Sequence, residues 1–232
     1  MRKYQALVVL MLISVCVLAG CRQREAGTLL FNANGEDFVR QGFVSKDGWA
    51  ITFEHVYITL AGITAYQSDP PYDAHSGEDI QAAVDVPLEG VYTVDLAEGD
   101  EEADPLPVGS VPDAPAGQYN AIAWQLVPAS QGPATGYVLL LVGRAEKEGQ
   151  VIDFTIGVDE PAYAYLCGEY VGDERKGILP DQGTADLEMT FHFDHIFGDA
   201  GIPLDDALNQ AAPGFEPFAA IAQAGALDVG MS

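Results

Sequence analysis

Hydrophobic residues recur along most of the chain, either alternately or in short continuous runs of strand length. Clusters of Gly, Pro and Asp, which favour turns, separate these runs. The predicted strands cover residues 28–33, 49–65, 90–96, 119–127, 136–145, 151–158 and 186–197. No amphipathic helix pattern lies between them. The sequence therefore predicts a mainly β fold, an antiparallel sandwich or barrel, of which we expect the β-sandwich.

Turn and loop sequences agree with this division into strands. Asp47-Gly48 precedes the second run, and Glu148-Gly149 separates the fifth run from the sixth as a hairpin turn would. Two acidic stretches that contain prolines, residues 67–78 and 97–116, interrupt the strand pattern. We interpret both as loops, and such a density of carboxylates is typical of a solvated face.

The pattern changes near the C-terminus. Residues 203–212 begin with proline and two acidic residues, as a first helical turn does, and residues 216–224 predict a second helix after a Pro-Gly pair. We therefore expect a β-sandwich domain over residues 28–198. A helical tail over residues 199–232, with one or two short helices, is expected to pack against it.

A signal peptide is predicted over residues 1–20. Arg2 and Lys3 precede an apolar run that extends from Ala6 to Ala19. This run is shorter than the roughly 18–20 apolar residues that a membrane-spanning helix needs. We therefore expect cleavage of the signal and not a retained transmembrane anchor.

The predicted signal ends in the sequence LAGC, in which the cysteine is Cys21. This motif resembles the lipobox of bacterial lipoproteins. The resemblance implies cleavage before Cys21, acylation of its thiol and a lipid anchor on the extracytoplasmic side of a membrane, with residues 21–27 as a polar tether. The residue after Cys21 is Arg22. An aspartate at this position would resemble an inner-membrane retention signal. Outer-membrane placement is therefore expected in a host with two membranes.

The chain is strongly acidic, with 35 Asp and Glu against 10 Lys and Arg and a formal net charge of −25. This balance argues against nucleic acid as a partner, because such binding depends on neutralising phosphates with Lys and Arg. An anionic membrane surface is repelled as well, so anchoring is left to the lipid. The charge serves either solubility, as in a saline habitat, or the attraction of divalent cations, and both interpretations stay open.

Three of the predicted strand segments carry a resemblance to a known family. The segments are WAITFEHVYITLAGITAY, YTVDL and PAGQYNAIAWQLVP, all within residues 28–158. They resemble a bacterial and archaeal family of exported lipoproteins of unknown function. The resemblance implies a transthyretin-like or immunoglobulin-like β-sandwich and brings no catalytic residues with it.

Only one cysteine remains for the folded part of the mature chain. Cys16 leaves with the signal and Cys21 is lipidated, so Cys167 has no partner for an intrachain disulfide. A lone thiol in an exported protein is either a buried small hydrophobe or a ligand or reactive group. Both interpretations stay open for Cys167.

The four histidines are unevenly distributed, because His192 and His195 fall within four residues. If residues 186–197 form a straight strand, alternation turns His195 inward and turns His192 and Asp194 outward. The same rule applied to the second run places His55 on an inward face. A buried imidazole needs a partner for its N–H and its lone pair, and a metal or a carboxylate supplies one.

These scarce residue types suggest a transition-metal site, because imidazole, thiolate and carboxylate are the ligands of zinc, copper and iron. A site that uses both neighbouring histidines requires the strand to end or bulge near Asp194. A straight strand would instead favour the two predicted inward histidines. Calcium is less expected because no EF-hand loop occurs. The candidate ligands are His55, Cys167, His192, Asp194 and His195, with Glu36 and Asp37 as possible acids.

The sequence contains no motif typical of a hydrolase, zinc protease, P-loop or dinucleotide-binding enzyme, and we do not expect an enzyme. The alternative to metal binding is a surface interaction or structural module that presents its acidic loops to an envelope protein partner. Tyrosines in or beside the predicted loops could contact such a partner or a glycan. They are Tyr66, Tyr72, Tyr163, Tyr165 and Tyr170.

Overall fold

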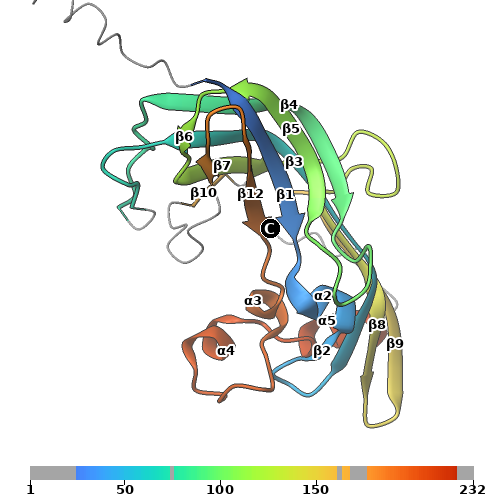
Figure 1. Cartoon of the computed structure of the whole chain (residues 1–232). Helices are drawn as coiled ribbons and strands as arrows, with labels where there is room; N and C mark the ends of the chain where they lie inside the picture. The colour runs from blue at the N-terminus through green and yellow to red at the C-terminus, as the bar shows by residue number, and fades with distance from the viewer. Residues whose placement is uncertain (1–24, 74–75, 161–163, 168–176, 224–232) are drawn as a thin grey trace, which may run out of the picture.

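The protein is represented by a computed structural model, in which the described residues are 25–73, 76–160, 164–167 and 177–223 (Figure 1). Side chains are described at these positions except for 164–167 and 222–223. The predicted signal peptide, Cys21 and His75 lie outside the described residues. Within these ranges no helix is both long enough and apolar enough to cross a membrane.

The fold is mainly β, as predicted, and its two principal sheets pack face to face as a sandwich (Figure 1). The seven-stranded sheet contains β2 (Phe43–Val44), β3 (Ala50–Gln67), β4 (Val84–Asp95), β7 (Ala121–Leu126), β8 (Leu139–Lys147), β9 (Gln150–Val158) and β10 (Ala164–Cys167). The three-stranded sheet has the order β12 (Thr184–Thr190), β1 (Gly27–Asn34), β5 (Leu106–Ala114). A small third sheet pairs β6 (Gly117–Gln118) with β11 (Ile178–Leu179).

Four short helices complete the described chain. They are α2 (Glu36–Gln41), α3 (Asp194–Phe197), α4 (Ala207–Ala211) and α5 (Glu216–Gln223). The two helices predicted for the tail are confirmed as α4 and α5. Asp206 caps α4, because its side chain accepts a hydrogen bond of 2.9 Å from the amide of Leu208. By contrast, α2 lies between strands where the sequence pattern predicted no helix.

The alternation of inward and outward side chains explains which residues of the smaller sheet are buried. Leu29, Phe31 and Ala33 of β1 are fully buried, and so are Leu187 and Met189 of the neighbouring β12. Every second residue of these strands faces the larger sheet, as the period of two predicts. These residues belong to one hydrophobic core together with the inward residues of β3 and β7.

Strand β3 is long and does not keep one phase, because two β-bulges interrupt it. The pairing register shifts between Phe53 and His55 and again between Ala61 and Ile63. Each bulge inserts one residue and exchanges the faces of everything that follows. The buried series is therefore Ile51, then Val56, Ile58 and Leu60, then Ile63 and Ala65.

Because of the first bulge, the side chain of His55 does not point into the core as predicted. An unbroken strand would place His55 and Tyr57 inward with Ile51, whereas both side chains are only partly buried and Val56 takes the inward position. The prediction was wrong because alternation holds only up to the first inserted residue.

The stretch 97–116, predicted as a loop, contains a strand. Residues 106–114 form β5, which pairs with β1 at the edge of the smaller sheet. Pro107 and Pro112 made this segment resemble a loop. Prolines are tolerated in an edge strand because one side of that strand makes no ladder hydrogen bonds.

The last predicted strand, residues 186–197, is shorter than expected and pairs differently. β12 ends at Thr190 and runs parallel to β1, whereas we expected antiparallel neighbours. The chain then turns into α3, and both Phe193, which precedes this helix, and Phe197, its last residue, are buried. Residues four apart share a face in a helix as well as in a strand, so the apolar pattern did not distinguish the two.

The helical tail is joined to the sandwich by aromatic packing. Phe215 is fully buried, and its ring centroid lies 5.3 Å from those of Trp49 and Phe154 and 5.9 Å from that of Phe197. These partners come from β9, from α3 and from the residue before β3. The tail therefore contributes to the same core as the strands.

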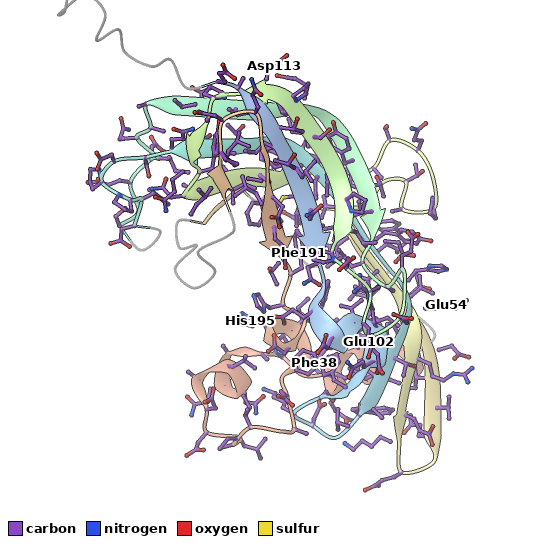
Figure 2. The ribbon with its side chains drawn as sticks, in the orientation of Figure 1. Phe38, Glu54, Glu102, Asp113, Phe191 and His195 are labelled. Atoms are coloured by element: carbon purple, nitrogen blue, oxygen red, sulfur yellow. The ribbon has the colours of Figure 1, made fainter. Side chains whose placement is uncertain are left out.

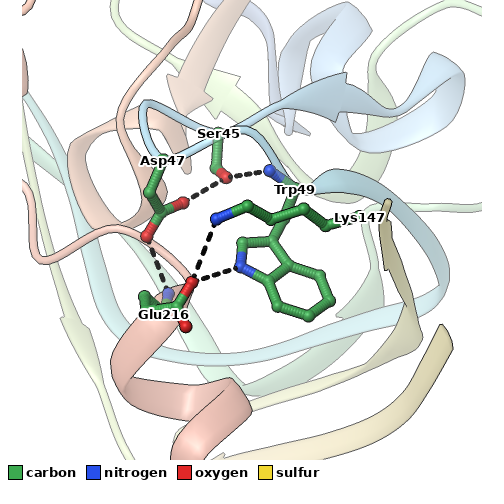
Figure 3. A network of polar contacts seen from close by, with 5 residues as sticks. All are labelled: Ser45, Asp47, Trp49, Lys147 and Glu216. Carbon is green, nitrogen blue, oxygen red and sulfur yellow. Dashed lines mark hydrogen bonds and ion pairs between the residues drawn. The ribbon is translucent and has the colours of Figure 1, made fainter. Parts of the chain in front are cut away.

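A polar network beside this cluster connects the tail to the loop before β3 (Figure 3). The indole of Trp49 and the ammonium of Lys147 donate hydrogen bonds of 2.9 and 3.2 Å to one carboxylate oxygen of Glu216. These contacts, that of Trp49 first, lower the pKa of Glu216. The amide of Glu216 in turn donates to Asp47, whose other oxygen accepts from Ser45. At neutral pH the carboxylate of Glu216 is therefore ionised, and it joins the start of α5 to Trp49 and Lys147.

Candidate functional site

The parallel pairing of β1 and β12 brings the ends of two distant segments together. Asn34 and Thr190 are partners in the last register position, and the amide of Phe191 still donates a 2.8 Å hydrogen bond to the carbonyl of Asn34. Since parallel strands end at the same edge of a sheet, the residues that follow both strands lie side by side. Glu36 and His192, each two residues beyond its strand end, meet there.

The contact between these two side chains is direct. Nδ1 of His192 lies 3.0 Å from Oε2 of Glu36. The imidazole is 47% exposed and the carboxylate side chain 34% exposed, so water reaches both. A polar contact this exposed stabilises a fold by about 1 kcal/mol at most. The pair is consequently of more interest for its chemistry than for stability.

A tight turn directs Glu36 toward the end of β12. Glu36 has φ of 59°, a left-handed conformation that costs a non-glycine residue about 1 kcal/mol or more. The side chain of Asn34 supports the turn, because its Oδ1 accepts the amide of Glu36 and its Nδ2 donates to Glu188, both at 2.9 Å. The two strands thus cooperate in placing one carboxylate.

Helix α3 adds the second histidine. Because the chain leaves the extended conformation after Thr190, the rings of His192 and His195 come within 5.6 Å, centroid to centroid. His195 is exposed, which corrects the prediction that it points into the core. Asp194 lies between the two histidines in the sequence. Its Oδ1 is buried without a hydrogen-bond partner among the described residues. Of the two arrangements considered from the sequence, the strand that ends early is the one observed.

As arranged in the structure, these side chains do not form a complete metal-binding site. Over residues 25–73, 76–160 and 177–223, no group of three or more His, Cys, Asp or Glu side chains could hold a metal ion as it stands. The structure brings together Glu36, His192 and His195, called here the strand-end cluster. It offers one close pair and a third group beside it.

His55 belongs to a different part of the molecule. Its Nδ1 lies 2.7 Å from Oδ2 of Asp95, and its ring stacks on Tyr57 with the centroids 5.1 Å apart. In Figure 2 the label of Glu54, the residue before His55, and that of His195 stand on opposite sides of the fold. The structure therefore does not bring His55 together with His192 and His195.

The partner of His55, Asp95, was missed by the sequence analysis. Oδ1 of Asp95 accepts hydrogen bonds from the amides of Val56, at 2.8 Å, and Ala97, at 3.2 Å. The carboxylate thus satisfies the backbone at the bulge in β3 while it binds the imidazole. An acidic residue at the end of a predicted strand was the signal in the sequence, but its partners lie 39 and 40 residues away.

Two other candidates are not part of the strand-end cluster as described. Asp37 lies in the first turn of α2 and is exposed. Cys167 is the last residue of β10, and its side chain lies outside the described part of the chain. Cys167 as a ligand therefore stays a prediction.

Comparisons with known proteins add no further constraint, because no family model, curated protein or solved structure matches this chain.

Proposed function

We propose that the protein is an exported lipoprotein, anchored by acylated Cys21 outside the cytoplasmic membrane, whose folded part binds a transition-metal ion at the strand-end cluster. The observation that carries the proposal is the convergence of Glu36, His192 and His195 at the shared end of two parallel strands. Asp194 is a fourth ligand candidate, because it has a buried oxygen without a described partner.

The distances support metal binding with small movements. Two ligand atoms on one tetrahedral ion, each about 2.0–2.2 Å from it, lie roughly 3.3–3.6 Å apart. Nδ1 of His192 and Oε2 of Glu36 are 3.0 Å apart, so they need to separate by only a few tenths of an ångström. The imidazole of His195 is exposed and can turn toward the same ion without disturbing the core.

The ligand types favour zinc, copper or iron. Two imidazoles with carboxylates suit these ions, whereas calcium prefers a shell made of oxygen atoms alone. The net charge of −25 raises the local concentration of any cation near the protein. His55, predicted as a distant ligand, is not part of this proposal, because Asp95 holds it elsewhere.

Metal binding predicts a stoichiometric ion that depends on the strand-end cluster. We expect protein purified without a histidine tag to retain about one ion after equilibration with zinc, copper(I) or ferrous iron. His192→Ala and His195→Ala should each weaken binding at least ~100-fold, since losing even an outer-shell partner costs about 10- to 100-fold. Elemental analysis after dialysis and competition with a chromogenic chelator measure both effects.

His55→Ala is the matched control and should retain the ion. The proposal fails if the wild type holds no ion, or if His55→Ala loses it as completely as His195→Ala does. Capture of an envelope protein by a metal-free chain, insensitive to chelator, would favour the interaction module instead.

Lipid anchoring makes a separate prediction. Cys21→Ser should move the protein from the membrane fraction to the soluble fraction, because acyl chains contribute about 0.8 kcal/mol per buried methylene and the acidic chain offers no electrostatic substitute. Fractionation of cells that express either form, together with mass spectrometry of the N-terminal peptide, measures the change. A variant that stays in the membrane fraction would contradict the proposed anchor.

A further inference from the structure

The connection between β7 and β8 is an excursion that the sheet does not need. β7 pairs with residues 60–66 of β3 and β8 with residues 50–58, on one continuous side of that strand. The amide of Val127 donates to the carbonyl of Thr59, and the amide of Thr59 donates to the carbonyl of Val138. Residues 128–137 therefore leave the sheet and return to it beside the same residue, Thr59. Compact loops whose ends meet in this way are frequently functional.

This loop, called here the β7–β8 loop, is ordered by its own small core. Ala129 and Ala134 are buried with Leu140, and Tyr57 packs against this group. The carbonyl of Ala129 accepts the amide of Gly136 at 2.8 Å, which closes the base of the loop. The loop is thus held over the solvent-facing side of the larger sheet and positions its tip, residues 130–133.

A cleft of about 820 Å³ lies between the tip of the loop and strands β4 and β5. Small-molecule sites in proteins span about 300–1,000 Å³. Its lining includes Tyr57 and the apolar side chains of Val91, Leu106 and Pro107. The side chain of Val91 is 59% exposed. The cleft therefore offers apolar surface to a ligand.

The charged residues of the cleft have one sign. Asp95 and Glu98 line it, and none of its lining residues in the described chain is Lys or Arg. The carboxylate of Asp95 already accepts from two backbone amides and pairs with His55, so Glu98 supplies the available charge. The guanidinium of Arg40 donates hydrogen bonds to the backbone carbonyls of Glu98, at 3.1 Å, Ala103 and Asp104. Arg40 therefore holds the backbone of this segment and leaves the carboxylate of Glu98 available to a ligand.

Tyr57 contributes an aromatic surface that stays neutral. Burial, followed by the charges of Asp95 and Glu54, raises the pKa of its hydroxyl, so the phenol remains protonated at any physiological pH. His55 stacks on the ring of Tyr57, with the two planes 20° apart. A neutral aromatic face beside carboxylates attracts ammonium groups, both through the ring quadrupole and through charge.

We infer that the cleft beneath the β7–β8 loop binds a small organic cation, an ammonium group that carries a short apolar or alkyl part. The ammonium would lie between Tyr57 and Glu98, with the alkyl part against Val91 and Pro107. This site is distinct from the strand-end cluster and goes beyond the proposed metal binding.

Choline is the probe that tests the inference, with its uncharged isostere 3,3-dimethylbutan-1-ol as the matched ligand. Titration calorimetry on the full chain in detergent should show saturable choline binding. The isostere should bind about 5- to 30-fold more weakly, since a desolvated cation–aromatic contact contributes about 1–2 kcal/mol. Glu98→Gln and Tyr57→Leu should each weaken choline binding about 5-fold or more.

Glu101→Gln is the matched control, because Glu101 lies in the same exposed acidic segment but does not line the cleft. It should bind choline like the wild type, and His192→Ala should do so as well. Circular dichroism checks that each variant is folded. The inference is overturned if choline does not saturate the protein up to ~10 mM. Equal binding of choline and its isostere, or equal losses in Glu98→Gln and Glu101→Gln, would overturn it too.

Discussion

Replacing Phe215 with alanine is expected to lower the free energy of unfolding by about 3–5 kcal/mol. The ring is fully buried and makes close contacts with the rings of Trp49 and Phe154. Truncation would open a cavity where the helical tail joins the sandwich. The loss is large compared with the roughly 5–15 kcal/mol of total stability typical of a domain. Urea-induced unfolding, followed by circular dichroism, measures the change.

Leu204→Ala provides the control for this measurement. Leu204 also lies in the tail, but its side chain is 70% exposed, so its truncation should change stability by about 0.5 kcal/mol or less. A cost below ~1 kcal/mol for Phe215→Ala would contradict the conclusion that the tail is part of the core. A transition that splits into two steps would instead show that the tail unfolds separately.

Asp95→Ala is expected to destabilise the protein by about 2–3 kcal/mol, the second largest effect that the structure predicts. The substitution removes the acceptor for the amides of Val56 and Ala97, and the Val56 amide belongs to a fully buried residue at the bulge in β3. An amide left without a partner away from water loses its hydration without compensation. The same denaturation measurement applies.

Two milder variants separate the contributions of this carboxylate. Asp95→Asn keeps an oxygen for the two amides and should cost about 1 kcal/mol. His55→Ala removes only the half-exposed imidazole, whose side chain is 42% exposed, and should also cost about 1 kcal/mol or less. If His55→Ala proves as damaging as Asp95→Ala, the imidazole and not the backbone contact organises the bulge.

The strand-end cluster shows which part of a site can be predicted from local sequence. His192 and His195 attract attention because they are close in the sequence, and Glu36 was among the possible acids. Their meeting depends on the parallel register of β1 with β12, which pairs residues about 156 positions apart along the chain. Alternation alone placed the two histidines on opposite faces. The early end of β12 placed their rings together.

The assignment of His55 failed for a related reason. The sequence shows that β3 is a strand, but it does not show where an extra residue enters the ladder. The bulge at His55 is stabilised by Asp95, which comes from another strand. One inserted residue reverses the faces of the whole segment that follows, so a local pattern cannot identify which histidine is buried.

The sequence by itself determined the mainly β character, the position of most strands, the hairpin turn at Glu148-Gly149 and the helices of the tail. These features depend on alternation, turn residues and helix starts, all of which act over a few neighbouring residues. Only the tertiary structure decided that β5 is an edge strand, that β1 and β12 run parallel, and which side chains gather at their common end. Strand partners and bulges are selected by contacts between distant segments, because a strand's hydrogen-bonding groups are satisfied by whichever neighbour packs beside it.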